Sequence, residues 1–153
     1  SAGEQQVILN GKNVNDFIRT ETVSEMSSKI SAIPEVREKL LSLQRSLAAA
    51  ENVIMDGRDI GTHVLPNADV KIFLTADAHV RAVRRYEEFI AKGVSCTLEN
   101  VEREVIERDE RDMNRAIAPL KQAEDAVRVD TSAMTIEEVV CYLKNLIGQA
   151  VAR

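Results

Sequence analysis

Short apolar runs alternate with longer stretches of helical periodicity over residues 52–153, and this alternation constrains the fold more than any other feature. The runs are VIM at 53–55, VKIFLT at 70–75 and AVRVDT at 126–131. The first is continuously apolar, which is typical of a strand with both sheet faces covered. Strands that alternate with helices favour a parallel, layered α/β sheet.

The helices between these strands are marked by residues that cap helix ends. Asp77 is a suitable N-cap for a helix over residues 78–92. The charged sequence TLENVEREVIERDERDMNR, residues 97–115, continues as an amphipathic helix. Thr135 and Glu138 form a capping box that opens the last helix.

The first fifty residues carry a different set of signals. The sequence QQVILNGKNV predicts a short strand that turns at Asn10 and Gly11, because Asn-Gly is a strong hairpin turn. Apolar residues at spacings of three and four predict a helix over 22–32. A second helix is expected from Pro34, a residue favoured in the first turn, to Ala50.

Composition and charge exclude some classes of function. The 153 residues include 20 basic and 25 acidic side chains, and the net charge of −5 argues against nonspecific binding to nucleic acid. No apolar run approaches the roughly 20 residues that span a bilayer. Cys96 and Cys141 lack the spacing of a metal site, so we expect free thiols and a cytoplasmic protein.

A charged turn, DGRD at residues 56–59, separates two of the apolar runs. It could simply be a solubilising loop. In open α/β sheets, however, ligands bind beyond the carboxyl ends of the strands, and this turn follows the predicted strand at 53–55. We therefore interpret Arg58 and Asp59 as candidates for holding a polar ligand.

Arginines recur in ERDERDMNR at the end of the charged helix. Arg108, then Arg111 or Asp112, and then Arg115 follow one another at spacings of three or four residues, so they share one helix face. They could form a solvated face with pairs such as Arg108–Asp112. The loop MNRAIAPL gives little structural reason to keep an arginine beside the helix end, which favours an anion site.

Other polar residues carry little information in isolation. Ser28 and the arginines at 19, 37, 84 and 85 are ordinary surface residues unless a site brings them together. His63 and His79 have no partner pattern for a catalytic triad or a metal site, so we interpret both as structural.

Taken in order, DGRDIGT, KIFLTA, RRYEE, ERDERDMNRAIAPL and DTSAMTIEEVV resemble the bacterial cytidylate (CMP) kinase family. VILNGKNVNDFIRTETV and IPEVREKLL resemble the monophosphate-binding insert of that family. The resemblance implies a partial P-loop-type nucleoside monophosphate kinase fold with a parallel sheet. Residues 1–50 would bind the monophosphate and residues 51–153 would form the core, with a short helical lid at about 93–119.

The resemblance also implies an activity. Members of the family are phosphotransferases of pyrimidine nucleotide metabolism that transfer the γ-phosphoryl group of ATP to CMP or dCMP, with Mg²⁺. Such chemistry depends on positioning and on neutralising charge over the phosphoryl oxygens. Arginine suits this task because its guanidinium stays charged and can bind phosphate oxygens through two donors.

The resemblance assigns roles to the nucleotide-binding residues. Ser28, Arg37 and Asp59 would contact the cytosine edge, and Arg58 would hold the CMP phosphate. Arg19 would lie beside the monophosphate site.

It also implies roles on the phosphate side. Asp112 and Arg108 would contact the sugar and phosphate, and Arg115 would clamp the phosphates, which makes Arg108 and Arg115 the candidate catalytic pair. Arg84 would lie near the adenine of ATP. Asp56 would support Mg²⁺ through water.

The sequence departs from the family in one respect. No G-x-x-x-x-G-K-[ST] pattern occurs in the 153 residues, and Gly11-Lys12 is followed by Asn13. The family's phosphate-binding loop would lie upstream, so we expect the chain alone to be inactive. The strand of that loop would also separate the strands at 53–56 and 70–74, so the isolated chain is expected to self-associate.

Two alternatives remain open. The chain could be a noncatalytic nucleotide-binding or regulatory module derived from such a kinase. It could also belong to a related nucleoside monophosphate kinase, although Ser28, Arg37 and Asp59 together favour cytosine.

Overall fold

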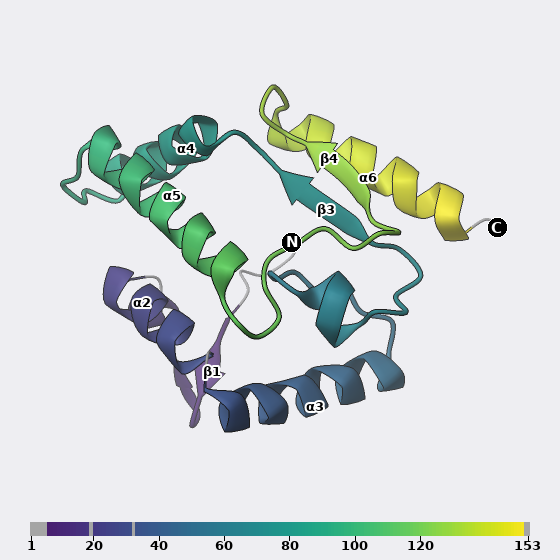
Figure 1. The fold of residues 1–153 in the computed structure, drawn as a ribbon. Helices are drawn as coiled ribbons and strands as arrows, with labels where there is room; N and C mark the ends of the chain where they lie inside the picture. Colours follow the sequence, from purple (N-terminus) through teal and green to yellow (C-terminus); the bar gives the residue numbers. More distant parts are fainter. Residues whose placement is uncertain (1–5, 19, 32, 152–153) are drawn as a thin grey trace. The chain divides into compact units, whose positions relative to one another are not determined.

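The computed structural model describes residues 6–18, 20–31 and 33–151, shown in Figure 1. The chain divides into two compact units, residues 1–52 and residues 53–153. The first unit contains a hairpin followed by helices, and the second contains a parallel strand pair with its connecting helices.

The hairpin pairs β1 (Ile8–Leu9) with β2 (Lys12–Asn13) in antiparallel register. The turn residues Asn10 and Gly11 have φ angles of 50° and 78°. Positive φ at both central positions is the requirement of a type I′ turn, which explains why Asn-Gly stands here. The hairpin predicted from the sequence is confirmed.

Helices α1 (Asn15–Ile18), α2 (Glu21–Ile30) and α3 (Pro34–Ala50) complete the described part of the first unit. The hydroxyl of Thr20 accepts a hydrogen bond from the backbone N–H of Val23 at 3.3 Å, which caps α2. The two predicted helices, 22–32 and 34–50, are confirmed to within two residues.

The second unit is built on β3 (Ile72–Thr75), which pairs in parallel with β4 (Val127–Asp130). The register runs from Ile72 opposite Val127 to Thr75 opposite Asp130. Helices α4 and α5 lie between the two strands in the sequence, so they form the crossover that a parallel pair requires (Figure 1). The predicted parallel arrangement is confirmed for this pair.

The strand predicted at residues 53–55 is absent, and that prediction was wrong for the described chain. Residues 52–56 form no ladder, and the side chain of Ile54 is 94% exposed. A strand exists only where a neighbour accepts its backbone hydrogen bonds, and β3 pairs with β4 rather than with this segment. Leu74 on β3 is likewise 53% exposed.

Helices α4 (Ala78–Ala91) and α5 (Leu98–Asn114) pack against each other. Ala82 of α4 and Val101 and Val105 of α5 form a buried cluster between them. A bidentate pair joins Arg81 Nη1 and Nη2 to the two oxygens of Asp109 at 3.1 and 2.6 Å. The two helices are thus fixed to each other by packing and by paired charge.

Predicted caps are present at both α4 and α6 (Ile136–Val151). The carboxylate of Asp77 accepts from the backbone N–H groups of His79 and Val80. Thr135 and Glu138 exchange side-chain-to-backbone hydrogen bonds of 2.8 and 3.2 Å, which completes the capping box. In the described ranges, no helix combines the length and the apolar character needed to cross a bilayer.

Candidate anion-binding site

The DGRD turn leads into an unusual helical turn. Residues Ile60–Val64 form η1, one turn of π-helix. The carbonyl of Asp59 accepts hydrogen bonds from the N–H groups of His63 at 2.8 Å and Val64 at 3.1 Å. A Cβ atom on Gly57 would lie 3.0 Å from Cγ1 of Ile60, so glycine permits the close approach of this turn. Single π turns often mark functional positions.

Asp112, on the last turns of α5, lies at the centre of the site. It is 7% exposed, and its Oδ2 lies 2.9 Å from Nε of Arg58 and 4.0 Å from Nε of Arg108. The Arg108 contact is the helical pair anticipated for a solvated face. Arg58, however, lies more than fifty residues upstream in the sequence. Its contact with Asp112 is therefore a tertiary contact, and this part of the helix face is not simply solvated.

The 2.9 Å contact is an ion pair rather than an aligned hydrogen bond. Oδ2 of Asp112 is buried and makes no hydrogen bond to any residue that the structure describes. Burying a carboxylate is costly unless opposite charge compensates it. Arg58 and Arg108 supply that charge.

Arg115 follows the end of α5 and contacts the DGRD turn. Its Nη2 lies 3.5 Å from Oδ1 of Asp59, and its Nε donates a hydrogen bond of 2.6 Å to the carbonyl of Ala118. The side chains of Arg115 and Asp59 are 23% and 13% exposed. Nη2 is buried without a hydrogen bond in the described ranges, so this donor retains capacity for a ligand oxygen.

The site carries more positive than negative charge. Among the described residues, Arg58, Arg108 and Arg115 form ion pairs with two carboxylates, Asp59 and Asp112. Asp109 also acts on Arg108, but it is itself paired with Arg81. The pKa of Arg108 is lowered first by burial and next by the positive charge of Arg58, while Asp112 acts in the opposite direction. An anion bound at this position would relieve the mutual repulsion of the guanidinium groups.

Arg85 on α4 adds a further positive charge that also lowers the pKa of Arg108. Its guanidinium carbon lies 5.1 Å from the centroid of the Phe89 ring, a cation–π contact one helical turn away. Sequence reasoning treated Arg85 as a solvated side chain. Nothing in the RRYEE segment indicates that Arg84 and Arg85 have different surroundings.

Arg84 points to a different part of the second unit. Its Nη2 donates to the carbonyls of Thr131 at 2.7 Å and Met134 at 3.3 Å. Arg84 therefore braces the turn that follows β4, and it does not join the arginines around Asp112. A contact with adenine stays a prediction.

The predicted residues of the first unit are described less completely. Nη1 of Arg37, on α3, lies 3.4 Å from the carbonyl of Ser31. Ser28 belongs to α2, but its side chain lies outside the described residues, and Arg19 lies outside them entirely. Their roles stay predictions.

Asp56 is exposed at the start of the DGRD turn. No group of three or more His, Cys, Asp or Glu side chains that could hold a metal occurs in the described part of the chain. Mg²⁺ does not need such a cluster, because it commonly binds through one or two carboxylates, water and substrate phosphates. A single carboxylate at Asp56 fits that mode.

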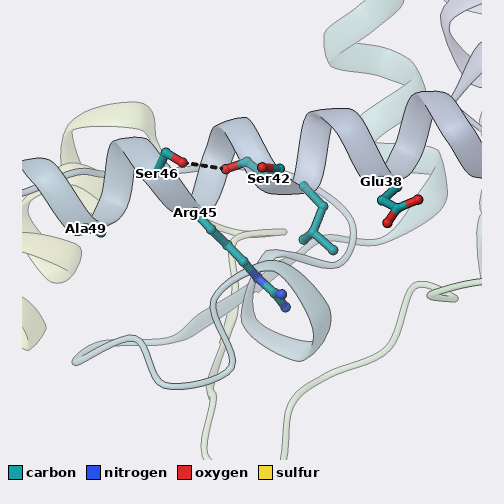
Figure 2. Close-up of a pocket in the computed structure, with 6 residues that line it drawn as sticks. Glu38, Ser42, Arg45, Ser46 and Ala49 are labelled. Atoms are coloured by element: carbon teal, nitrogen blue, oxygen red, sulfur yellow. Dashed lines mark hydrogen bonds between the residues drawn. The ribbon is translucent and has the colours of Figure 1, made fainter.

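A separate hollow lies along α3. Figure 2 shows its lining residues, all from this one helix: Glu38, Leu41, Ser42, Arg45, Ser46 and Ala49. Within it, Ser46 Oγ donates to the carbonyl of Ser42 at 2.9 Å. None of the predicted site residues lines this hollow, so it is not the candidate site.

Replacing Asp112 by asparagine is expected to lower the free energy of unfolding by about 1–3 kcal/mol, because two guanidinium groups lose their compensating charge. Glu107→Gln is the matched control: Glu107 pairs with Arg111 at 4.0 Å on the same helix, but both side chains are more than half exposed. Removing that pair should change stability by less than about 0.5 kcal/mol. Urea unfolding of the chain measures both, and equal losses would contradict a special role for Asp112.

Comparison with known proteins gives a consistent result. A family model described as cytidylate kinase matches residues 1–149. The cytidylate kinase of Carboxydothermus hydrogenoformans is 54% identical over 145 residues, and that of Ligilactobacillus salivarius is 51% identical over 146. Each alignment covers 95% of this chain. The chain spans about 65% of the length of these relatives.

Proposed function

Because the chain belongs to the cytidylate kinase family, we propose that the whole protein transfers the γ-phosphoryl group of ATP to CMP or dCMP. The observation that carries the proposal is the convergence of Arg58, Arg108 and Arg115 on two carboxylates. A cluster with excess positive charge on rigid backbone is suited to a phosphate group.

The arginines would act by neutralising charge. During transfer, negative charge spreads over the equatorial oxygens of the phosphoryl group, and preorganised donors stabilise it without moving. Arg115 is the strongest candidate, since its Nε is already bonded to Ala118 and its buried Nη2 retains a hydrogen-bonding capacity. It would clamp the phosphates between donor and acceptor nucleotides.

Arg58 and Arg108 would hold the monophosphate. Both side chains are 40% exposed, while Asp112 beneath them is buried. The carboxylate would therefore orient the two guanidinium groups from one side, leaving their outer donors for phosphate oxygens. Asp112 would also contact the sugar. Arg84 would contribute on the ATP side, near the adenine.

Ser28, Arg37 and Asp59 would contact the cytosine edge, and Arg19 would lie beside the monophosphate. Mg²⁺, when bound with ATP, would supply charge neutralisation on the phosphates, with Asp56 supporting it through water. Residues 93–119 would act as a lid over ATP.

The activity is tested by measuring ADP release from ATP by the whole protein with CMP, dCMP or UMP as acceptor. Turnover with CMP and dCMP that greatly exceeds turnover with UMP would support the proposal. A protein that binds CMP but consumes no ATP would instead support a noncatalytic nucleotide-binding module.

Asp59→Ala is expected to reduce the ratio of kcat/KM for CMP over UMP by about tenfold or more, because a base-reading carboxylate discriminates the exocyclic amine. Asp59 also lies 3.5 Å from Arg115, so the same variant tests whether Asp59 acts by orienting that arginine. Equal losses with both nucleotides would mean that Asp59 acts through Arg115 and not on the base. Asp69→Ala, at an exposed aspartate of the same unit, is the control.

A further inference from the structure

Ala118 adopts a backbone conformation that alanine avoids. Its φ angle is 47°, in the left-handed region. The other described non-glycine residue with positive φ is Asn10, whose side chain tolerates that region and which lies in a hairpin turn. Ala118 also precedes Pro119, and a residue before proline normally prefers an extended conformation. The surrounding structure must therefore impose this geometry.

Two hydrogen bonds close the loop that contains Ala118. Nε of Arg115 donates to the carbonyl of Ala118 at 2.6 Å, and the N–H of Leu120 donates to the carbonyl of Asp112 at 2.8 Å. The loop thus folds back onto the last turn of α5. With its positive φ, Ala118 directs its carbonyl toward the Arg115 guanidinium. The hydrogen bond to Nε holds one edge of the guanidinium in place.

The other edge of the same guanidinium faces the candidate site. Nη2 of Arg115 is the atom that lies 3.5 Å from Asp59 and is buried without a hydrogen bond in the described ranges. A guanidinium is planar, so fixing Nε also restricts where Nη2 points. The conformation of Ala118 and the direction of the Arg115 donors are consequently linked.

We propose that Ala118 is a positioning residue, whose left-handed conformation presents the carbonyl that aims Arg115 at the anion. Its effect on turnover rests on the proposed function. Its effect on the Arg115 side chain does not. The two effects can be measured separately.

The structural arm follows the Arg115 Nε–H by nitrogen-15 NMR in the 153-residue chain. Ala118→Val places a β-branched residue where left-handed φ is strongly disfavoured, and should speed exchange of this proton with water roughly tenfold. Ala118→Gly should leave exchange slow, because glycine adopts this φ readily. Ala116→Val, at an exposed position two residues earlier without positive φ, should also leave it slow.

The kinetic arm uses the whole protein. Ala118→Val should lower kcat by roughly tenfold with a smaller change in KM for CMP, whereas the conservative Ala118→Gly should retain the rate. Loss of slow exchange in Ala118→Gly would overturn the proposal, even if Ala118→Val fails to fold, since the alanine methyl would then matter instead of the backbone. Unaltered exchange in a folded Ala118→Val protein would overturn it as well. Changed exchange with no turnover in the wild-type protein would refute the proposed function alone.

Discussion

Replacing Arg115 by alanine in the whole protein is expected to lower kcat by about 10²–10³-fold, or about 3 kcal/mol of transition-state stabilisation. The side chain is three-quarters buried, bonded through Nε to Ala118, and directed through Nη2 toward Asp59. Its charge is thus held in place before substrate arrives, which is the condition under which one donor contributes most. Steady-state ADP release with saturating CMP and ATP measures the loss.

Arg111→Ala is the matched control for this substitution. Arg111 lies four residues earlier, at the end of the same helix, but its side chain is 65% exposed and 4.0 Å from Glu107. Its removal should leave kcat within about twofold, as expected of a surface pair. Arg115→Lys should not restore the rate. A lysine ammonium cannot both donate to the carbonyl of Ala118, as Nε does, and direct a second donor toward Asp59, as Nη2 does. Similar kcat values for Arg115→Ala, Arg115→Lys and Arg111→Ala would show that Arg115 has no catalytic role.

The 153 residues alone are expected to show no CMP-dependent ADP release above the protein-free rate. Transfer requires backbone N–H groups and a lysine around the β- and γ-phosphates, and no G-x-x-x-x-G-K-[ST] pattern occurs in this sequence. The arginines around Asp112 can neutralise charge, but they do not replace that phosphate cradle. A coupled assay with purified chain measures the rate.

The whole protein, assayed at the same concentration, is the positive control. Circular dichroism of the chain would establish that its helices are formed, so that inactivity cannot be attributed to unfolding. A rate within tenfold of that of the whole protein would contradict the expectation, and would require the phosphates to be bound by residues other than a glycine-rich loop.

The helices were predictable from the sequence because their determinants are local. Pro34 in the first turn of α3, Asp77 at the cap of α4 and the Thr135–Glu138 box each act within one turn of helix. The Asn10–Gly11 turn was predictable for the same reason. In each case the residues that specify the element are adjacent to it.

The absence of a strand at 53–55 could not be predicted from the residues of that segment. Continuous apolarity indicates burial, but a ladder depends on a neighbouring strand, and β3 has β4 on one edge only among the described strands. The site shows the same division. Spacing along α5 placed Arg108 and Asp112 on one face, whereas the approach of Arg58 and the φ of Ala118 arise from tertiary folding.

The π turn at Ile60–Val64 makes this segment sensitive to the insertion or deletion of a residue. In a π turn, one more residue is wound into the helix than an α turn of the same kind would hold. Deleting any single residue between Asp59 and Leu65 would favour an α turn and rotate everything before it by about 100°. Arg58 would then swing away from Asp112, although the connection to β3 would still be long enough. A one-residue deletion within Ile60–Val64 is therefore expected to disturb the Arg58–Asp112 contact more than a substitution at an exposed position of the same unit.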